Sequence, residues 1–138
     1  MSLDIFSENI LDYYRNPRNK GVLQKPDLQA RDNNPSCGDT VVLQLELSGD
    51  KVGKVRFNGT GCAISQASAS MLAEKLEGIT LQEAVRLSAK DVLEMLGIPV
   101  NGQRLKCALL SLHVLKMSLK GKFGEKVKDD YFELQAQQ

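Results

Sequence analysis

A cysteine between a strand-like run and a helix-like run constrains this chain more than any other feature. The stretch reads Asn58-Gly59-Thr60-Gly61-Cys62-Ala63-Ile64-Ser65. Before it, residues 54–57 alternate charged and apolar side chains, the period of a half-buried strand. After it, residues 63–76 are rich in Ala, Ser, Met and Leu, a composition typical of a helix. Cys62 is therefore predicted to lie where a strand meets the positive end of a helix, a position that favours a thiolate.

Length and composition predict one globular domain. The 138 residues suffice for a single domain, residues 1–138, with its own core. The net charge of +1 gives no electrostatic argument for nucleic acid or an anionic membrane surface. No apolar run approaches membrane-spanning length, so we expect no membrane partner. Because the first residues are acidic where a signal peptide needs basic ones, we expect a cytoplasmic protein.

Before Cys62, the pattern predicts one helix and a β-hairpin. Residues 2–15 have an imperfect apolar helical face, which Asn16-Pro17 ends. Residues 18–34 are polar and contain turn formers, so they are predicted to be a long irregular connection, either functional or a plain surface loop. Apolar and polar side chains alternate along residues 41–47 and return along residues 52–58 after a turn. This pattern predicts an antiparallel hairpin with one buried face.

After Cys62, the pattern predicts only helices. The first is predicted to begin near Ser65 and to end at Gly78, a C′ glycine. A short helix is opened by the capping box Thr80 to Glu83, and the next is capped by Ser88 and closed by Gly97. A long amphipathic helix is predicted from Arg104 to Leu119, ended by Gly121. A helix, a short antiparallel sheet and several further helices indicate an α+β domain. We expect the helices to pack on one face of the sheet.

Three cysteines, Cys37, Cys62 and Cys107, are the candidate reactive groups. An odd number cannot pair completely within one chain, and no two are spaced as in a zinc finger or a thioredoxin-type motif. A free cysteine is often only a small buried hydrophobic residue. All three, however, lie at glycine-flanked turns or at the start of a helix. Two interpretations of the three cysteines therefore stay open: a metal or sulfur site, and a purely structural role.

A tetrahedral site with three thiolates needs a fourth ligand. The single histidine, His113, lies six residues beyond Cys107, about 9 Å along a helix and about 120° around it. We therefore expect His113 to be a core or interface residue rather than a ligand. Asp39 lies two residues after Cys37, so an extended segment would direct both side chains the same way. A Cys₃Asp set could bind Zn²⁺ or iron, although Asp39 could instead be a turn residue bonded to its own backbone.

The motifs Asn34-Pro35-Ser36-Cys37-Gly38-Asp39, Gly59-Thr60-Gly61-Cys62-Ala63-Ile64-Ser65 and Arg104-Leu105-Lys106-Cys107-Ala108 closely resemble those of one known family. It is the iron–sulfur cluster assembly scaffold family, comprising IscU, SufU and the N-terminal domain of NifU. The resemblance covers almost the whole chain, including Tyr13-Tyr14-Arg15-Asn16-Pro17-Arg18-Asn19. It implies a scaffold that receives sulfur from a cysteine desulfurase and iron from a donor, builds a [2Fe–2S] cluster, and passes it to apo-proteins.

The resemblance also implies which residues form the site. Cys37, Asp39, Cys62 and Cys107 would hold the cluster or Fe²⁺ transiently, and members are often found with Zn²⁺ there. Cys107 and Cys37 are the candidate sulfur acceptors. For a scaffold we expect Cys107 to accept the sulfur, because of its helix start and Lys106. If zinc holds Cys107, we expect Cys37 to accept it from its loop.

Three local differences leave two activities open. Lys106 stands where IscU proteins have histidine, and this resembles SufU, a zinc-dependent sulfurtransferase that relays persulfide from the desulfurase. The insertion of roughly twenty residues that SufU proteins usually carry before this cysteine is absent. The chaperone-binding Leu-Pro-Pro-Val-Lys segment of IscU is also missing, and Ile98-Pro99-Val100-Asn101 takes its place, so an Hsp70-type chaperone is not expected as a partner. A purely structural zinc site is a third interpretation.

Overall fold

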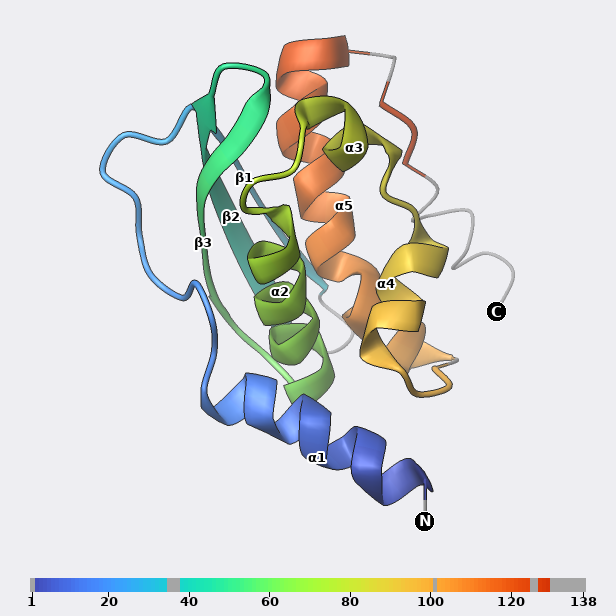
Figure 1. Ribbon diagram of the computed structural model, residues 1–138. Coiled ribbons are helices and arrows are strands. Elements are labelled where there is room, and N and C mark those ends of the chain that lie inside the picture. The colour runs from blue at the N-terminus through green and yellow to red at the C-terminus, as the bar shows by residue number, and fades with distance from the viewer. Residues whose placement is uncertain (1, 35–37, 101, 125–126, 130–138) are drawn as a thin grey trace.

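A three-stranded antiparallel sheet forms one layer of the protein, and helices cover one of its faces (Figure 1). The computed structural model describes residues 2–34, 38–100, 102–124 and 127–129. The strands are β1 (Leu28–Asn34), β2 (Asp39–Ser48) and β3 (Lys51–Thr60), in the order β1-β2-β3. Buried and half-buried side chains alternate along β2. The predicted α+β architecture and the β2–β3 hairpin are confirmed.

Strand β1 corrects the prediction for residues 18–34. Its seven residues pair with β2 from Leu28 opposite Leu45 to Asn34 opposite Asp39. The segment has only two apolar residues, and its outward side chains are exposed, so its own sequence lacks a strand pattern. It becomes a strand because β2 supplies a hydrogen-bonding edge and α5 (Gln103–Phe123) packs against it. The irregular connection is therefore limited to residues 16–27.

The remaining helices largely follow the predicted capping signals. They are α1 (Ser2–Arg15), α2 (Ala63–Leu76), α3 (Leu81–Arg86) and α4 (Ala89–Leu96). The predicted capping box of Thr80 with Glu83 forms, Ser88 caps α4 as predicted and does so in a capping box with Asp91, and Gly97 closes α4 in the left-handed conformation. In the part of the chain that the structure describes, none of the helices is both long and apolar enough to cross a membrane.

Two helix ends lie a few residues from their predicted capping positions. Helix α2 begins two residues before Ser65, because the Cys62 side chain itself caps it. Helix α5 continues through Gly121 to Phe123 and is closed by Gly124. A glycine inside a helix costs about 1 kcal/mol relative to alanine. The half-buried side chain of Phe123 packs against the core and offsets that cost.

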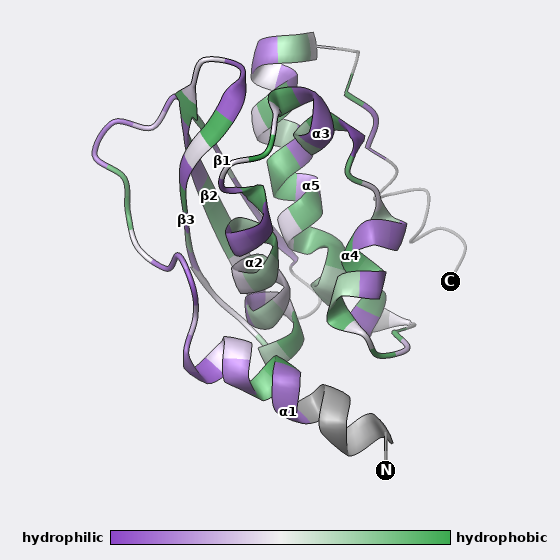
Figure 2. Ribbon diagram, viewed as in Figure 1, coloured by the Kyte–Doolittle hydropathy of each residue, from purple (hydrophilic) through white to green (hydrophobic). Residues whose placement is uncertain are grey.

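The core lies between the sheet and the pair α2 and α5. Figure 2 shows that the middle of α5 is mostly apolar. Residues 65–73 of α2 are all buried, and most are small, so the helix can approach both α5 and β3 closely. The Ser68 hydroxyl donates a hydrogen bond to the carbonyl of Ala108 on α5 (2.6 Å). This packing fixes the starts of α2 and α5 relative to the sheet.

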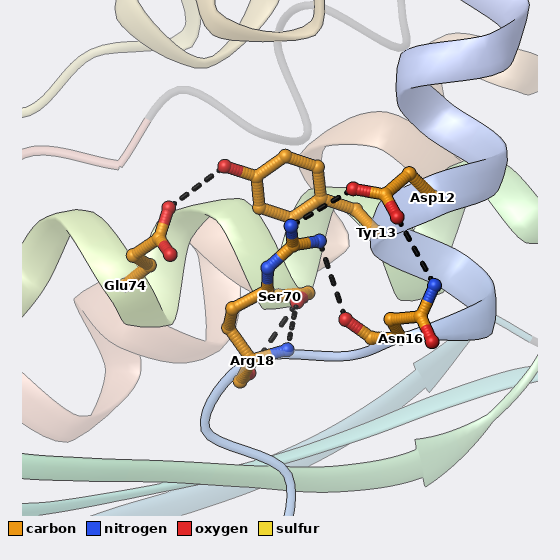
Figure 3. Close-up of polar contacts among 6 residues, drawn as sticks. All are labelled: Asp12, Tyr13, Asn16, Arg18, Ser70 and Glu74. Atoms are coloured by element: carbon orange, nitrogen blue, oxygen red, sulfur yellow. Dashed lines mark hydrogen bonds and ion pairs between the residues drawn. The ribbon is translucent and has the colours of Figure 1, made fainter.

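Arg18 anchors the end of α1 to α2 (Figure 3). Its guanidinium lies 4.0 Å from the centre of the Tyr13 ring and forms a 2.8 Å ion pair with Asp12. Its backbone N–H donates to the Ser70 hydroxyl (2.7 Å). The Tyr13 hydroxyl donates to Glu74 (2.7 Å), and this bond to a carboxylate raises the pKa of Tyr13. The connection from α1 to the sheet is thus held against the middle of α2.

His113 links α5 to two other segments. The side chain is buried and donates from Nδ1 to Asp129 (2.6 Å) and from Nε2 to Asp32 on β1 (3.1 Å). Two carboxylate partners require both ring nitrogens to carry protons. Burial lowers the pKa of His113, but the hydrogen bond to Asp129 and the charges of Asp129 and Asp32 outweigh it and raise the pKa. The prediction of a core or interface histidine is confirmed.

We predict that His113→Gln removes a pH-dependent part of the stability. Since the folded-state pKa is raised above its unfolded value of about 6.5, the stabilisation is fully present below that pH and is lost as pH rises through the folded pKa. Urea unfolding between about pH 5.5 and pH 9 should show the wild type losing its advantage over the variant as pH rises. Parallel pH profiles for the two proteins would contradict this assignment.

Candidate metal centre

Four chain segments meet at one end of the molecule, the lower end in Figure 1. Asp39 is the first residue of β2, and Cys62 lies between the end of β3 and the start of α2. Cys107 lies in the first turns of α5. The β2–β3 register sets Thr40 opposite Thr60, which brings Asp39 beside the residues that lead into Cys62. The fold thereby gathers groups that are 68 positions apart in the sequence.

A carboxylate oxygen of Asp39 and the sulfur atoms of Cys62 and Cys107 all lie within 4.8 Å of one another. Ligands of a tetrahedral zinc ion, at bonds of about 2.3 Å, lie about 3.8 Å apart. The three groups are therefore within about one ångström of that separation. Asp39 and Cys107 are buried, whereas Cys62 is exposed. The geometry is that of a metal site with one side open to solvent.

Asp39 connects two of the ligand positions. Its Oδ1 accepts a hydrogen bond from the backbone N–H of Cys62 (2.9 Å). Its Oδ2 is fully buried, and no described residue donates to it. A buried carboxylate oxygen without a donor costs free energy unless a cation or another ligand satisfies it. The residues present therefore fit a bound metal ion.

Cys62 is held by its own helix. Its Sγ accepts the backbone N–H of Ser65 (3.4 Å), which makes it the N-cap of α2. This places the sulfur at the positive end of the helix, where negative charge is stabilised. The strand-to-helix position predicted for Cys62 is confirmed. Cys37, predicted to be a ligand, lies outside the described residues.

A model of the family described as NifU-like N terminal domain matches residues 5–130. The chain belongs to the NifU-like N-terminal domain family. Two relatives carry names for two different roles. The zinc-dependent sulfurtransferase SufU of Bacillus subtilis is 35% identical over 129 residues, covering 81% of this chain and 87% of that protein. The iron–sulfur cluster assembly scaffold protein IscU of Aquifex aeolicus is 35% identical over 117 residues, covering 83% of this chain and 74% of that protein.

A crystal structure shares the fold. It is described as a putative iron–sulfur cluster assembly scaffold protein for the SUF system from Fervidobacterium islandicum AW-1. It is 32% identical, superposes with a TM-score of 0.75, and covers 87% of this chain and 100% of that one. The membership that the three cysteine motifs predict is thus confirmed. Because the identity to SufU and to IscU is the same, sequence similarity does not distinguish a sulfurtransferase from a scaffold.

Two glycines of the Gly59-Thr60-Gly61 segment give the site its space. A Cβ on Gly61 would lie 2.3 Å from Asp39 Oδ1 and 2.7 Å from the Ser65 hydroxyl oxygen. A Cβ on Gly59 would lie 2.0 Å from the carbonyl oxygen of Thr40, on the neighbouring strand. Gly59 therefore permits the close pairing of β3 with β2, and Gly61 leaves room for the carboxylate.

Two polar residues beside the site have no predicted role. Ser65 and Gln66 are buried in the first turn of α2, and the Gln66 amide contacts the Ser65 hydroxyl (3.2 Å). In the sequence, both residues are only part of a run with a composition typical of a helix. One sequence signal could have identified Ser65 and Gln66. They are polar residues in the helical turn that Cys62 caps, so they lie next to a candidate ligand.

We predict that Gly61→Ala weakens metal binding without unfolding the protein. The new methyl group would displace the Asp39 carboxylate and break its bond to the Cys62 N–H. Zinc affinity, measured by competition with a chromophoric chelator, should fall at least about tenfold. Gly78→Ala is the matched control, because Gly78 also has a positive φ (91°) but no atom beyond its chain neighbours lies within 4 Å of its Cβ. Wild-type affinity in Gly61→Ala would show that Asp39 is not a ligand.

Proposed function

We propose that this protein is a scaffold on which a [2Fe–2S] cluster is assembled and from which it is transferred. In this proposal Cys37, Asp39, Cys62 and Cys107 hold the cluster or its Fe²⁺ precursor, and the same groups hold Zn²⁺ in a metal-bound form. The main supporting observation is the convergence of Asp39, Cys62 and Cys107, with the buried Asp39 Oδ2 lacking a described donor.

The chemistry of the donors suits assembly followed by release. Thiolates are the usual ligands of iron–sulfur clusters, and three of them supply most of the binding. Asp39 contributes a hard oxygen donor that matches thiolate-bound iron less well, so it is the ligand that an incoming cysteine of an acceptor can displace. Cys62 is exposed, which supports access to the site from one side. A cysteine desulfurase, an iron donor and apo iron–sulfur proteins are the proposed partners.

A zinc-dependent sulfurtransferase is the alternative function, and Lys106 favours it. The half-buried Lys106 stands directly before Cys107, so its charge would stabilise a thiolate there. In the transfer step, a cysteine thiolate of this chain attacks the outer sulfur of the desulfurase persulfide. A new S–S bond forms on this chain, the original S–S bond breaks, and the desulfurase cysteine leaves as a thiolate. No external oxidant or reductant is consumed.

A purely structural zinc site is the third possibility. In that case chelation would unfold the protein. The continuous core formed by the sheet, α2 and α5 argues against a fold that needs metal.

Anaerobic reconstitution separates the two main activities. The protein is mixed with a cysteine desulfurase, cysteine and Fe²⁺ and followed by visible absorption and circular dichroism. A cluster chromophore on this chain supports the scaffold. Faster desulfurase turnover without a chromophore would favour the sulfurtransferase instead. The absence of both a chromophore and faster turnover would contradict both proposed activities.

We predict that Asp39→Ala gives a folded protein whose cluster persists longer and transfers more slowly to an apo-ferredoxin. The variant keeps every cysteine but loses the exchangeable ligand, and its zinc affinity should also fall. Circular dichroism of the loaded protein follows the transfer. Asp27→Ala is the matched control, because the Asp27 carboxylate also accepts a backbone N–H, from Leu47 (2.7 Å). Unchanged or faster transfer from Asp39→Ala would contradict the role proposed for Asp39.

We predict that sulfur from the desulfurase is accepted by Cys37 or Cys107. Cys107 is only 4% exposed, and a buried thiolate cannot readily attack a persulfide carried by another protein. Of the two candidates, Cys37 is therefore favoured. Mass spectrometry of the wild type and of Cys37→Ser, Cys62→Ser and Cys107→Ser after desulfurase treatment identifies the acceptor. Added sulfur confined to Cys62 would contradict the prediction.

A further inference from the structure

We infer that Ser65 and Gln66 are positioning residues for Cys62, with Gln66 acting through the Ser65 hydroxyl. This inference rests on the proposed metal site and adds to it two residues that do not touch the metal. Both side chains are buried, Ser65 at 0% and Gln66 at 5% exposure. They lie in the turn of α2 that follows the cysteine.

Cys62 is fixed at three of its polar atoms. Its backbone N–H donates to Asp39 Oδ1 (2.9 Å), and its Sγ accepts the N–H of Ser65 (3.4 Å). Its carbonyl accepts the backbone N–H of Gln66 (3.1 Å) and also the hydroxyl of Ser65 (3.4 Å). The second bond to this carbonyl is not part of the helical pattern. The Ser65 backbone N–H thus holds the sulfur, and the Ser65 hydroxyl holds the carbonyl.

The Gln66 amide sets the direction of the Ser65 hydroxyl. Gln66 Nε2 donates to Ser65 Oγ (3.2 Å). With that lone pair engaged, the hydroxyl proton is free to point at the Cys62 carbonyl. The same oxygen lies 2.7 Å from where a Cβ on Gly61 would be, so it packs against the backbone that precedes the cysteine. The chain of contacts runs from Gln66 through Ser65 to Cys62.

The cost of Gln66 indicates that its amide is not there for stability alone. Its Oε1 is buried, and no described residue donates to it. An unsatisfied buried amide oxygen destabilises a protein, whereas an apolar side chain of the same length would not. A role in holding Cys62 accounts for the placement of a donor at this position.

Contacts of this kind alter a metal site measurably. Residues that orient a ligand change metal affinity by about 10- to 100-fold when they are removed. A Cys62 carbonyl that is no longer held would also let the sulfur shift relative to the metal, and this changes the sulfur-to-metal charge-transfer band. A residue that only packs in the helix would change the stability of the metal-free protein and leave the spectrum of the metal-bound protein alone.

Cobalt titration tests the inference. Co²⁺ serves as a spectroscopic substitute for Zn²⁺, and the sulfur-to-cobalt charge-transfer band is recorded for the wild type, Ser65→Ala and Gln66→Met. We expect about tenfold weaker binding and a shifted band in both variants. Because Gln66 acts through Ser65, the double variant should be no weaker than Ser65→Ala.

Ser70→Ala is the matched control. Ser70 is equally buried further along α2, but its hydroxyl bonds to the backbone of Arg18 and not to Cys62. We expect this variant to lower the melting temperature of the metal-free protein without changing the cobalt band. Wild-type affinity and spectrum in Ser65→Ala and Gln66→Met, or additive losses in the double variant, would overturn the inference. Failure of the wild type to bind Co²⁺ would instead overturn the metal site itself, and the inference with it.

Discussion

The hydrogen bond from the Cys62 backbone N–H to Asp39 Oδ1 is the contact on which the candidate site depends. It joins the first residue of β2 to the residue that caps α2. The bond forms because the hairpin register brings the end of β3 beside the start of β2, and because Gly61 leaves space for the carboxylate. It also leaves the second Asp39 oxygen buried and available to a cation. This one hydrogen bond therefore aligns Asp39 with Cys62 and leaves Asp39 Oδ2 free to coordinate a metal ion.

The rest of the fold supplies the third ligand and the rigidity. Small buried side chains let α2 lie against α5, so the starts of the two helices, which carry Cys62 and Cys107, meet at the same end of the sheet. His113 ties the middle of α5 to Asp32 on β1 and to Asp129. The Arg18 network holds the connection from α1 against α2. The site is thus built on packed helices and strands, while its open side is formed by the exposed Cys62.

Local chemistry in the sequence predicts much of this arrangement, and non-local contacts explain what it misses. The hairpin, the helix caps at Thr80 and Ser88, and the strand-to-helix position of Cys62 follow from alternation, capping residues and turn residues that act over a few positions. Strand β1 could not be predicted in this way, because its polar residues become a strand only against the edge of β2. The convergence of Asp39 with Cys107 depends on packing between distant elements, so residue chemistry offered it only as one alternative, and the family resemblance supported it. The buried polar pair Ser65 and Gln66 was missed because small and polar residues in a helix give no sign of what will cover them.

The most direct test of the account is X-ray absorption spectroscopy at the zinc edge of the zinc-loaded protein. The proposed ligand set predicts three sulfur atoms at about 2.3 Å and one oxygen at about 2.0 Å. Cys37→Ser should reduce the number of sulfur ligands to two, because Cys37 is the third proposed sulfur ligand. Cys37 is also the one proposed ligand outside the described residues. The chain has a single histidine, and His113 is already bonded to two carboxylates. Imidazole scattering from the metal, or fewer than three sulfur ligands in the wild type, would contradict the account.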